Sequence, residues 1–114
     1  MENPKRRVRI KIWIETEDGD TLFGEGQISV LEAIEKEGSI NAAARSLKMG
    51  YRSMWGRLKK LEQRIGQPLL IRRKGGRIGG ESILTPEAGA MIKSFRNVKR
   101  RIEGASTTIF EEEW

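Results

Sequence analysis

The apolar positions of this chain follow mainly the helical periodicity. From about Gln27 to Glu37, apolar residues recur every three or four positions, which predicts a helix that ends at Gly38. Ser39 is a good N-cap and predicts a second, short helix with a narrow apolar stripe. Residues 48–50 are too few for anything but a turn, after which a third helix is expected from about Tyr51 to Ile65.

The third helix has the clearest division between apolar and polar positions. At about 100° per residue, its apolar side chains fall on one arc about 120° wide. These are Tyr51, Met54, Trp55, Leu58, Leu61 and Ile65. The opposite arc is polar and holds Arg52, Ser53, Gly56, Lys60 and Gln63. Such a helix buries one face in the protein and leaves the other for solvent or for a partner.

Three segments are predicted to form strands. Val8–Thr16 alternates strictly between apolar and polar residues, which predicts a half-buried N-terminal strand. We interpret Trp13, on the polar face of this strand, as a packing residue that covers a neighbouring helix or a partner subunit. Leu69–Ile71 and Ser82–Leu84 predict the two strands of a hairpin. The loop of residues 72–81 between them contains four glycines and four basic residues, so we expect it to be functional or disordered.

A long last helix is expected to begin at Thr85-Pro86-Glu87, which supplies an N-cap, a first-turn proline and an acidic residue. Gly104 should weaken it, and residues 109–114 should form an apolar and acidic tail. The apolar residues of its distal part have no obvious partner within so short a chain: Val98, Ile102, Ile109, Phe110 and Trp114. We therefore expect a homodimer joined through the segment from about residue 86 onwards.

These elements predict a mainly α fold with a small β component. The arrangement is a winged helix-turn-helix with an N-terminal strand and a long C-terminal dimerisation helix, in one domain over residues 1–114. No apolar run is long enough for a membrane span, and the charged N-terminus is not a signal peptide. A cytoplasmic protein without a membrane partner is expected.

The distribution of charge points to nucleic acid. Eleven of the 22 Lys and Arg residues lie between positions 45 and 77, with only one of the 16 acidic residues, Glu62. This is the footprint expected for contact with phosphates, although a solvated charged face is the alternative. The chain has no Cys and no His, which excludes disulfides and thiolate metal sites and removes the commonest general base. We expect no enzyme, no metal and no cofactor.

The outer face of the third helix and the glycine-rich loop are the expected DNA contacts. Arg52 and Ser53 are placed to bond base edges in a major groove. Gly56 either lets the helix backbone approach the groove closely or makes room for a bulky neighbour such as Trp55. The basic residues of the loop are suited to contacts with phosphates. The alternative is that Arg77 inserts into a narrow minor groove.

The sequence resembles the N-terminal DNA-binding domain of the molybdate-responsive transcription regulators, the ModE family. The matching pieces are EGSINAAARSLKMGYRSMWGRLKKLE, KGGRIGGES and ILTPEAGAMI, and the similarity extends from about Val8 to Ile102. LysR-type regulators share the LxxLExxxG and LTPxG elements more distantly. The resemblance implies a homodimeric winged helix-turn-helix that binds an operator, with Trp55 in the core. Gly50 departs from it, because the family usually has a serine helix cap there.

Residues and resemblance together give one set of candidate DNA-binding residues: Tyr51, Arg52, Ser53, Gly56, Arg57, Lys60, Arg72, Arg73, Lys74 and Arg77. Tyr51 enters this set only through the resemblance. The expected partners are double-stranded DNA and a second copy of the chain.

Regulators of the ModE family carry molybdate-binding domains after this one, and this sequence ends at Trp114. We therefore expect a sequence-specific transcription regulator without its own molybdate-binding domain, unless the sequence is a piece of a longer protein. Such a regulator would act without an effector or with a separate effector-sensing protein. The alternatives are an architectural, nucleoid-type DNA-binding protein with little sequence preference and a winged helix that contacts only proteins.

Overall fold

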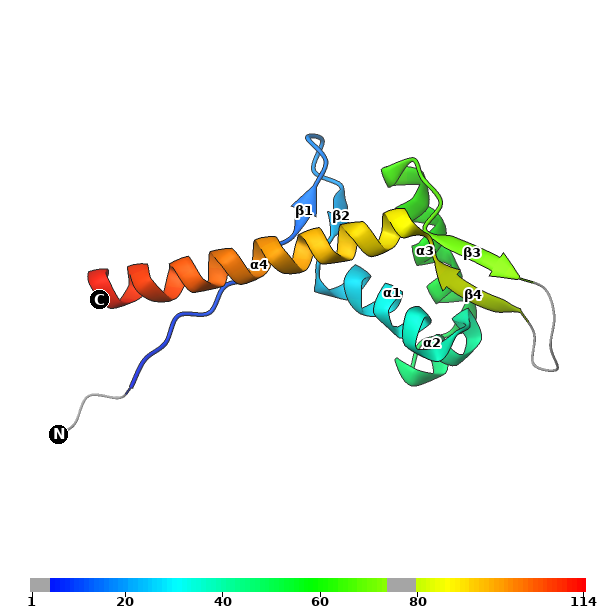
Figure 1. Cartoon of the computed structure of the whole chain (residues 1–114), viewed down its shortest axis with the longest axis horizontal. Helices are drawn as coiled ribbons and strands as arrows, with labels where there is room; N and C mark the ends of the chain where they lie inside the picture. The colour runs from blue at the N-terminus through cyan, green and yellow to red at the C-terminus, as the bar shows by residue number, and fades with distance from the viewer. Residues whose placement is uncertain (1–4, 74–79) are drawn as a thin grey trace.

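The computed structural model describes residues 5–73 and 80–114. A body of three helices and two small hairpins lies at one end, and one long helix extends away from it, giving overall dimensions of 62 × 34 × 22 Å (Figure 1). Along the chain the elements are β1 (Ile14–Glu15), β2 (Thr21–Phe23), α1 (Glu25–Glu37), α2 (Ile40–Ser46), α3 (Tyr51–Ile65), β3 (Leu70–Arg73), β4 (Glu81–Leu84) and α4 (Pro86–Glu113). The predicted fold class, a mainly α winged helix-turn-helix with a long C-terminal helix, is confirmed.

The helix-turn-helix forms where the local signals place it. Gly38 ends α1 in the left-handed region with φ 82°, and its N–H donates to the carbonyl of Ile34 at 2.8 Å. Ser39 caps α2, since its hydroxyl accepts from the amide of Ala42 at 3.0 Å. A short turn follows, in which Lys48 has φ 55°, and α3 then begins at Tyr51.

The core lies where α1, α2 and α3 meet, with β2, the second hairpin and the start of α4 around it. Its largest fully buried side chains are Phe95, Ile28, Leu31, Ile34, Met54, Leu58 and Leu69. Thr85 joins the wing hairpin to α4, because its hydroxyl accepts from the amide of Ala88 and donates to the carbonyl of Pro68. Ser82 ties β4 to the end of α1 by donating its amide to the carbonyl of Gly38 at 2.8 Å. These bonds fix the hairpin against the end of α1 and the start of α4.

The N-terminal strand was predicted too long. Only Ile14–Glu15 pairs, with β2, and the backbone of residues 8–13 makes no backbone hydrogen bond to any other described residue. The alternation is still visible in the burial of the side chains, because Val8, Ile10 and Ile12 are half-buried. A strand needs a partner, and β2 ends at Phe23, where the chain turns into α1. Trp13 covers little, because 57% of its surface is exposed.

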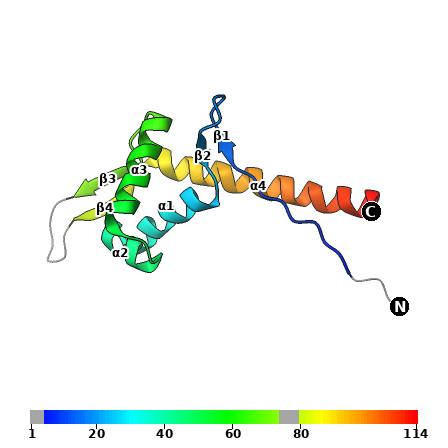
Figure 2. The ribbon, with the colours of Figure 1, turned by 180° about the vertical axis from the view of Figure 1, so that it is seen from behind.

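The last helix runs without a break through Gly104 to Glu113, so the expected tail is helical. Hydroxyls around the glycine donate to helix carbonyls, Ser106 and Thr107 to Glu103 and Thr108 to Gly104. The N-terminal segment crosses α4 and ends near its distal half (Figure 2). There the guanidinium of Arg6 lies 5.6 Å from the ring centroid of Trp114.

Candidate nucleic-acid interface

Helix α3 separates its apolar and polar faces as predicted. Met54, Leu58 and Leu61 are buried against the core. The polar residues opposite them are all exposed: Arg52, Ser53, Gly56, Lys60 and Gln63. Gly50 leaves the first turn of α3 without a side-chain cap, so the free amides of that turn lie at the exposed end of the helix.

Trp55 holds together one flank of this face. Its indole N–H donates to the hydroxyl of Tyr51 at 2.7 Å, and the guanidinium of Arg72 lies 4.2 Å from its ring centroid. The ammonium of Lys59 is 5.2 Å from the same ring. Cation–π contacts of this kind contribute about 0.5–1 kcal/mol at exposed sites. Trp55 therefore fixes Arg72 of β3 beside the N-terminal half of α3.

This arrangement revises two predictions from the apolar arc. Tyr51 is not a core residue, because 41% of its surface is exposed. Trp55 is half-buried at the edge of the core, where its ring supports Arg72, and is not enclosed. The signal for this cluster was an aromatic pair four residues apart with basic residues nearby. The sequence pattern did not reveal this cluster because Arg72 lies 17 positions after Trp55 in the chain.

The glycine-rich loop between β3 and β4 is the wing, and the structure describes two of its four basic residues. Arg72 and Arg73 are the last residues of β3, both exposed, and they lie opposite Ser82 and Glu81 of β4. Lys74 and Arg77 lie outside the described residues. The remaining candidates, Arg57 and Lys60, lie on the other flank of α3, which faces α1.

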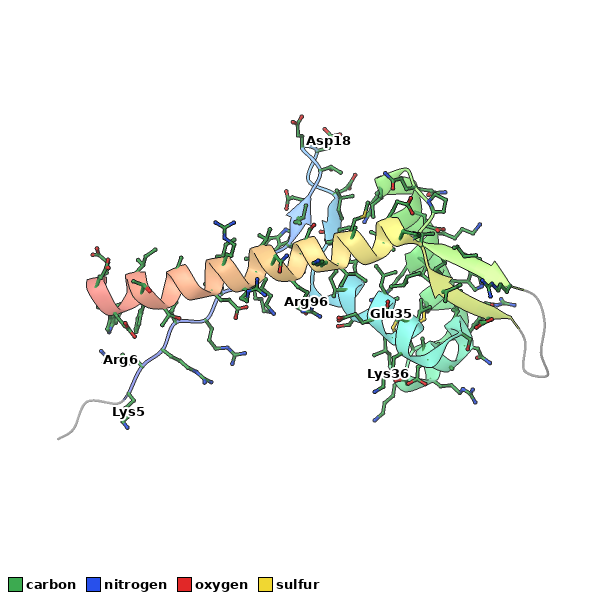
Figure 3. All side chains as sticks on the ribbon, in the orientation of Figure 1. Lys5, Arg6, Asp18, Glu35, Lys36 and Arg96 are labelled. Atoms are coloured by element: carbon green, nitrogen blue, oxygen red, sulfur yellow. The ribbon has the colours of Figure 1, made fainter. Side chains whose placement is uncertain are left out.

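Two of the acidic residues near this surface, Glu25 and Glu62, are engaged elsewhere. Glu25 of α1 accepts hydrogen bonds from Lys99 at 2.6 Å and from Arg96 at 3.1 Å, both on α4. Arg96 is labelled in Figure 3. The bond from Lys99, followed by that from Arg96, holds the pKa of the Glu25 carboxyl below its usual value. Glu62, the one acid of α3, accepts from the amide of Leu69 at 2.7 Å. The exposed face of α3 thus keeps its positive charge.

The described residues offer no other chemistry that competes with this interpretation. They contain no cluster of three acidic side chains suited to a metal ion. No helix among them has the length and apolar content needed to cross a membrane.

Known proteins share both the sequence and the fold. The family model described as bacterial regulatory helix-turn-helix protein, lysR family, matches residues 26–89. The chain belongs to this family. It is similar to the molybdenum transport protein ModE of Azotobacter vinelandii, with 32% identity over 94 residues, 82% of this chain and 35% of that protein. The transcriptional regulator ModE of Haemophilus influenzae is 33% identical over 86 residues, 75% of this chain and 34% of that protein.

Among solved structures, the chain resembles the DNA-binding domain of BenM, crystallised with benA site 1 DNA. The TM-score is 0.55 at 20% identity, covering 80% of this chain and 98% of that one, which establishes the shared fold. The chain spans about a third of the length of the curated relatives it matches. It is a helix-turn-helix transcription regulator related to the ModE proteins, which confirms the resemblance seen in the sequence.

Proposed function

We propose that the chain binds double-stranded DNA with sequence specificity, as a homodimer in the cytoplasm. The observation that carries the proposal is the exposed face of α3, which is polar and basic, while the one acid of the helix, Glu62, is bonded to the amide of Leu69. An α-helix fits the major groove, where arginine can bond guanine in a bidentate manner. Arg52 and Ser53 lie in the first turn of α3 and take the base-reading role.

Gly56 supports a close approach of the helix backbone to DNA. A Cβ built at this position would meet no atom within 4 Å, so the packing of Trp55 does not require glycine here. In a helix interior glycine costs about 0.5–1 kcal/mol relative to alanine. A partner that touches the backbone at Gly56 would explain why the residue is tolerated.

The other candidates take phosphate contacts. Tyr51 accepts a hydrogen bond from Trp55, which leaves its own hydroxyl hydrogen for a phosphate oxygen. The remaining residues proposed for this role are Arg57, Lys60, Arg72, Arg73, Lys74 and Arg77. The basic residues of the wing among them contribute to affinity and little to sequence specificity, because phosphates carry no sequence information directly.

The homodimer is supported by the distal part of α4. Val98, Ile102 and Ile109 leave 43%, 43% and 57% of their surfaces exposed, and they line one shallow apolar hollow of about 460 Å³. A twofold dimer through this face would place two recognition helices about one DNA turn apart, about 34 Å, and would favour a near-palindromic site.

The decisive experiment selects bound sequences from a random duplex pool and then compares Arg52→Ala with the unchanged chain. We expect the variant to lose about 1–3 kcal/mol of binding free energy on the selected site and much less on random DNA. Arg100→Ala, an exposed arginine of α4, is the matched control and should leave the preference intact. Equal losses on both DNAs would make Arg52 a phosphate anchor. A pool without enrichment would favour the architectural alternative.

A further inference from the structure

A basic hollow of about 280 Å³ lies between α1 and α3, on the flank of α3 away from the wing hairpin. Its cationic wall comes from α3 and comprises Arg57, Lys60 and Arg64. Its other wall comes from the start of α1 and comprises Gly26, Gln27 and Val30. Leu58 and Leu61 complete the described lining, which contains no carboxylate.

Helical geometry brings the three bases together. Residues three and four positions apart lie on one side of a helix, so positions 57, 60 and 64 form a single strip. Arg64 is anchored, because its Nη1 donates to the carbonyl of Thr21 at 3.0 Å. One of its five N–H groups is used in this bond, which leaves others for a ligand.

The two carboxylates nearest in sequence to the residues that line the hollow are turned away from the strip of basic residues. Glu25, at the start of α1, bonds Lys99 and Arg96 of α4. Glu62 bonds the amide of Leu69 on the hairpin side of α3. The hollow is therefore lined by three cations whose mutual repulsion no side chain in its described lining offsets.

We propose that this hollow binds phosphate oxygens of the DNA backbone, on the strand opposite the one contacted by the wing. The inference rests on the proposed entry of α3 into a major groove. That groove is about 12 Å wide and a helix with side chains is about 10–12 Å across, so each flank of α3 would face one backbone. The cluster of Trp55 and Arg72 serves one flank. Arg57, Lys60 and Arg64 serve the other.

Gly26 gives a direct test, because it lines the hollow and a Cβ there would meet no atom within 4 Å. Gly26→Glu adds a carboxylate to the hollow beside its three basic residues, and the new Cβ does not clash with any neighbouring atom. An acidic residue in the first turn also suits α1, so the fold should be retained. We expect affinity to fall by about tenfold or more on selected and random DNA alike. The slope of log affinity against log salt should flatten by about one unit per subunit for each phosphate that the variant no longer neutralises.

Two variants serve as controls. Gly26→Ala makes the same helical improvement without charge and should change affinity by less than about twofold. Gly104→Glu adds the same charge on an exposed position of α4, where a Cβ also meets nothing within 4 Å. If Gly104→Glu weakens binding as much as Gly26→Glu, the effect is one of net charge and the proposal is wrong.

Arg64→Gln gives an independent measurement, because Arg64 is the one cationic residue of this wall that the proposed function does not already assign to DNA. A salt slope lower by about one unit supports the proposal. An unchanged slope in both Arg64→Gln and Gly26→Glu would overturn it. Failure of the proposed function is separable, since the unchanged chain would then neither bind DNA nor enrich a sequence from the random pool.

Discussion

The winged-helix body and the distal half of α4 treat apolar side chains in opposite ways. In the body, Met54 and Leu58 of α3 are 0% and 2% exposed, and the exposed face of the same helix is basic. In α4 only Ala88 and Phe95 are buried, and beyond them Val98 and Ile102 each leave 43% of their surface exposed. Both helices are amphipathic, but one hides its apolar face and the other shows it. This difference is the basis for the partners proposed above, phosphates for α3 and a second copy of the chain for α4.

The same contrast separates what holds each region in place. The body has a closed core, and the hydroxyls of Ser39 and Thr85 cap the starts of α2 and α4. The distal half of α4 is held chiefly by helical hydrogen bonds and by contacts near its end, where the rings of Phe110 and Trp114 stack at 5.6 Å. Helices without tertiary packing are marginal in water. The distal half should therefore depend on association, and the body should not.

The largest expected effect comes from truncating one leucine or isoleucine in each region. Leu58→Ala should lower the free energy of unfolding by about 2–5 kcal/mol, because it opens a cavity in the core. Ile102→Ala should cost far less when the chain is monomeric, and its cost should grow with protein concentration. Urea denaturation at several protein concentrations measures both.

Ile102→Glu tests the assembly itself. The unchanged chain should have the mass of a dimer by light scattering at tens of micromolar, and the variant that of a monomer. A monomeric mass for the unchanged chain, with and without DNA, would remove the dimer from the proposed function. An equal cost of Leu58→Ala and Ile102→Ala in the monomer would show that the two regions do not differ as described.

Local signals predicted the body well because each acts within a few residues. The helix Tyr51–Ile65 and the caps at Gly38, Ser39 and Thr85 follow from such signals, and the structure confirms them. The length of the N-terminal strand was predicted wrongly, because alternation indicates which side chains face inward and does not indicate a partner for the backbone. Gly104 does not end the last helix, because a single glycine penalty is small within a helix of 28 residues.

The candidate interface was predicted as a face but not as two flanks. The polar arc of α3 could be read from residue spacing alone. The contact between Trp55 and Arg72 and the bond from Arg64 to Thr21 join residues 17 and 43 positions apart. Such pairings depend on how β3 and β2 pack beside α3, which no periodicity specifies.

A smaller effect distinguishes the two exposed mid-helix glycines, Gly56 of the body and Gly104 of distal α4. A Cβ at either would meet no atom within 4 Å, so alanine should raise stability by about 0.5–1 kcal/mol in each case. Only Gly56→Ala should weaken DNA binding, because only that backbone is proposed to approach the groove. Thermal unfolding and DNA titration measure the two properties separately. Unchanged affinity in Gly56→Ala would mean that the helix backbone stays away from DNA.

The smallest effect concerns the ion pairs that join the two regions. Glu25 of α1 bonds Lys99 and Arg96 of α4, which lowers the pKa of its carboxyl in the folded chain. A lowered folded pKa means that the stabilisation is complete above the ordinary glutamate value of about 4.3. It is then lost as the pH falls through the lowered value. Because 48% of the Glu25 side chain is exposed, solvent screening should keep the contribution below about 1 kcal/mol.

Glu25→Gln should therefore lower the free energy of unfolding slightly at pH 7, and the difference from the unchanged chain should shrink at low pH and in high salt. Glu35→Gln, an exposed glutamate of the same helix, is the control and should show no such dependence (Figure 3). Denaturant titrations at pH 7 and below pH 4 give the comparison. If the two variants respond alike at every pH, the ion pairs from Glu25 to α4 contribute nothing measurable. The ion pair between Arg96 and Glu32 of α1 and the buried side chain of Phe95 would still hold α4 against the body.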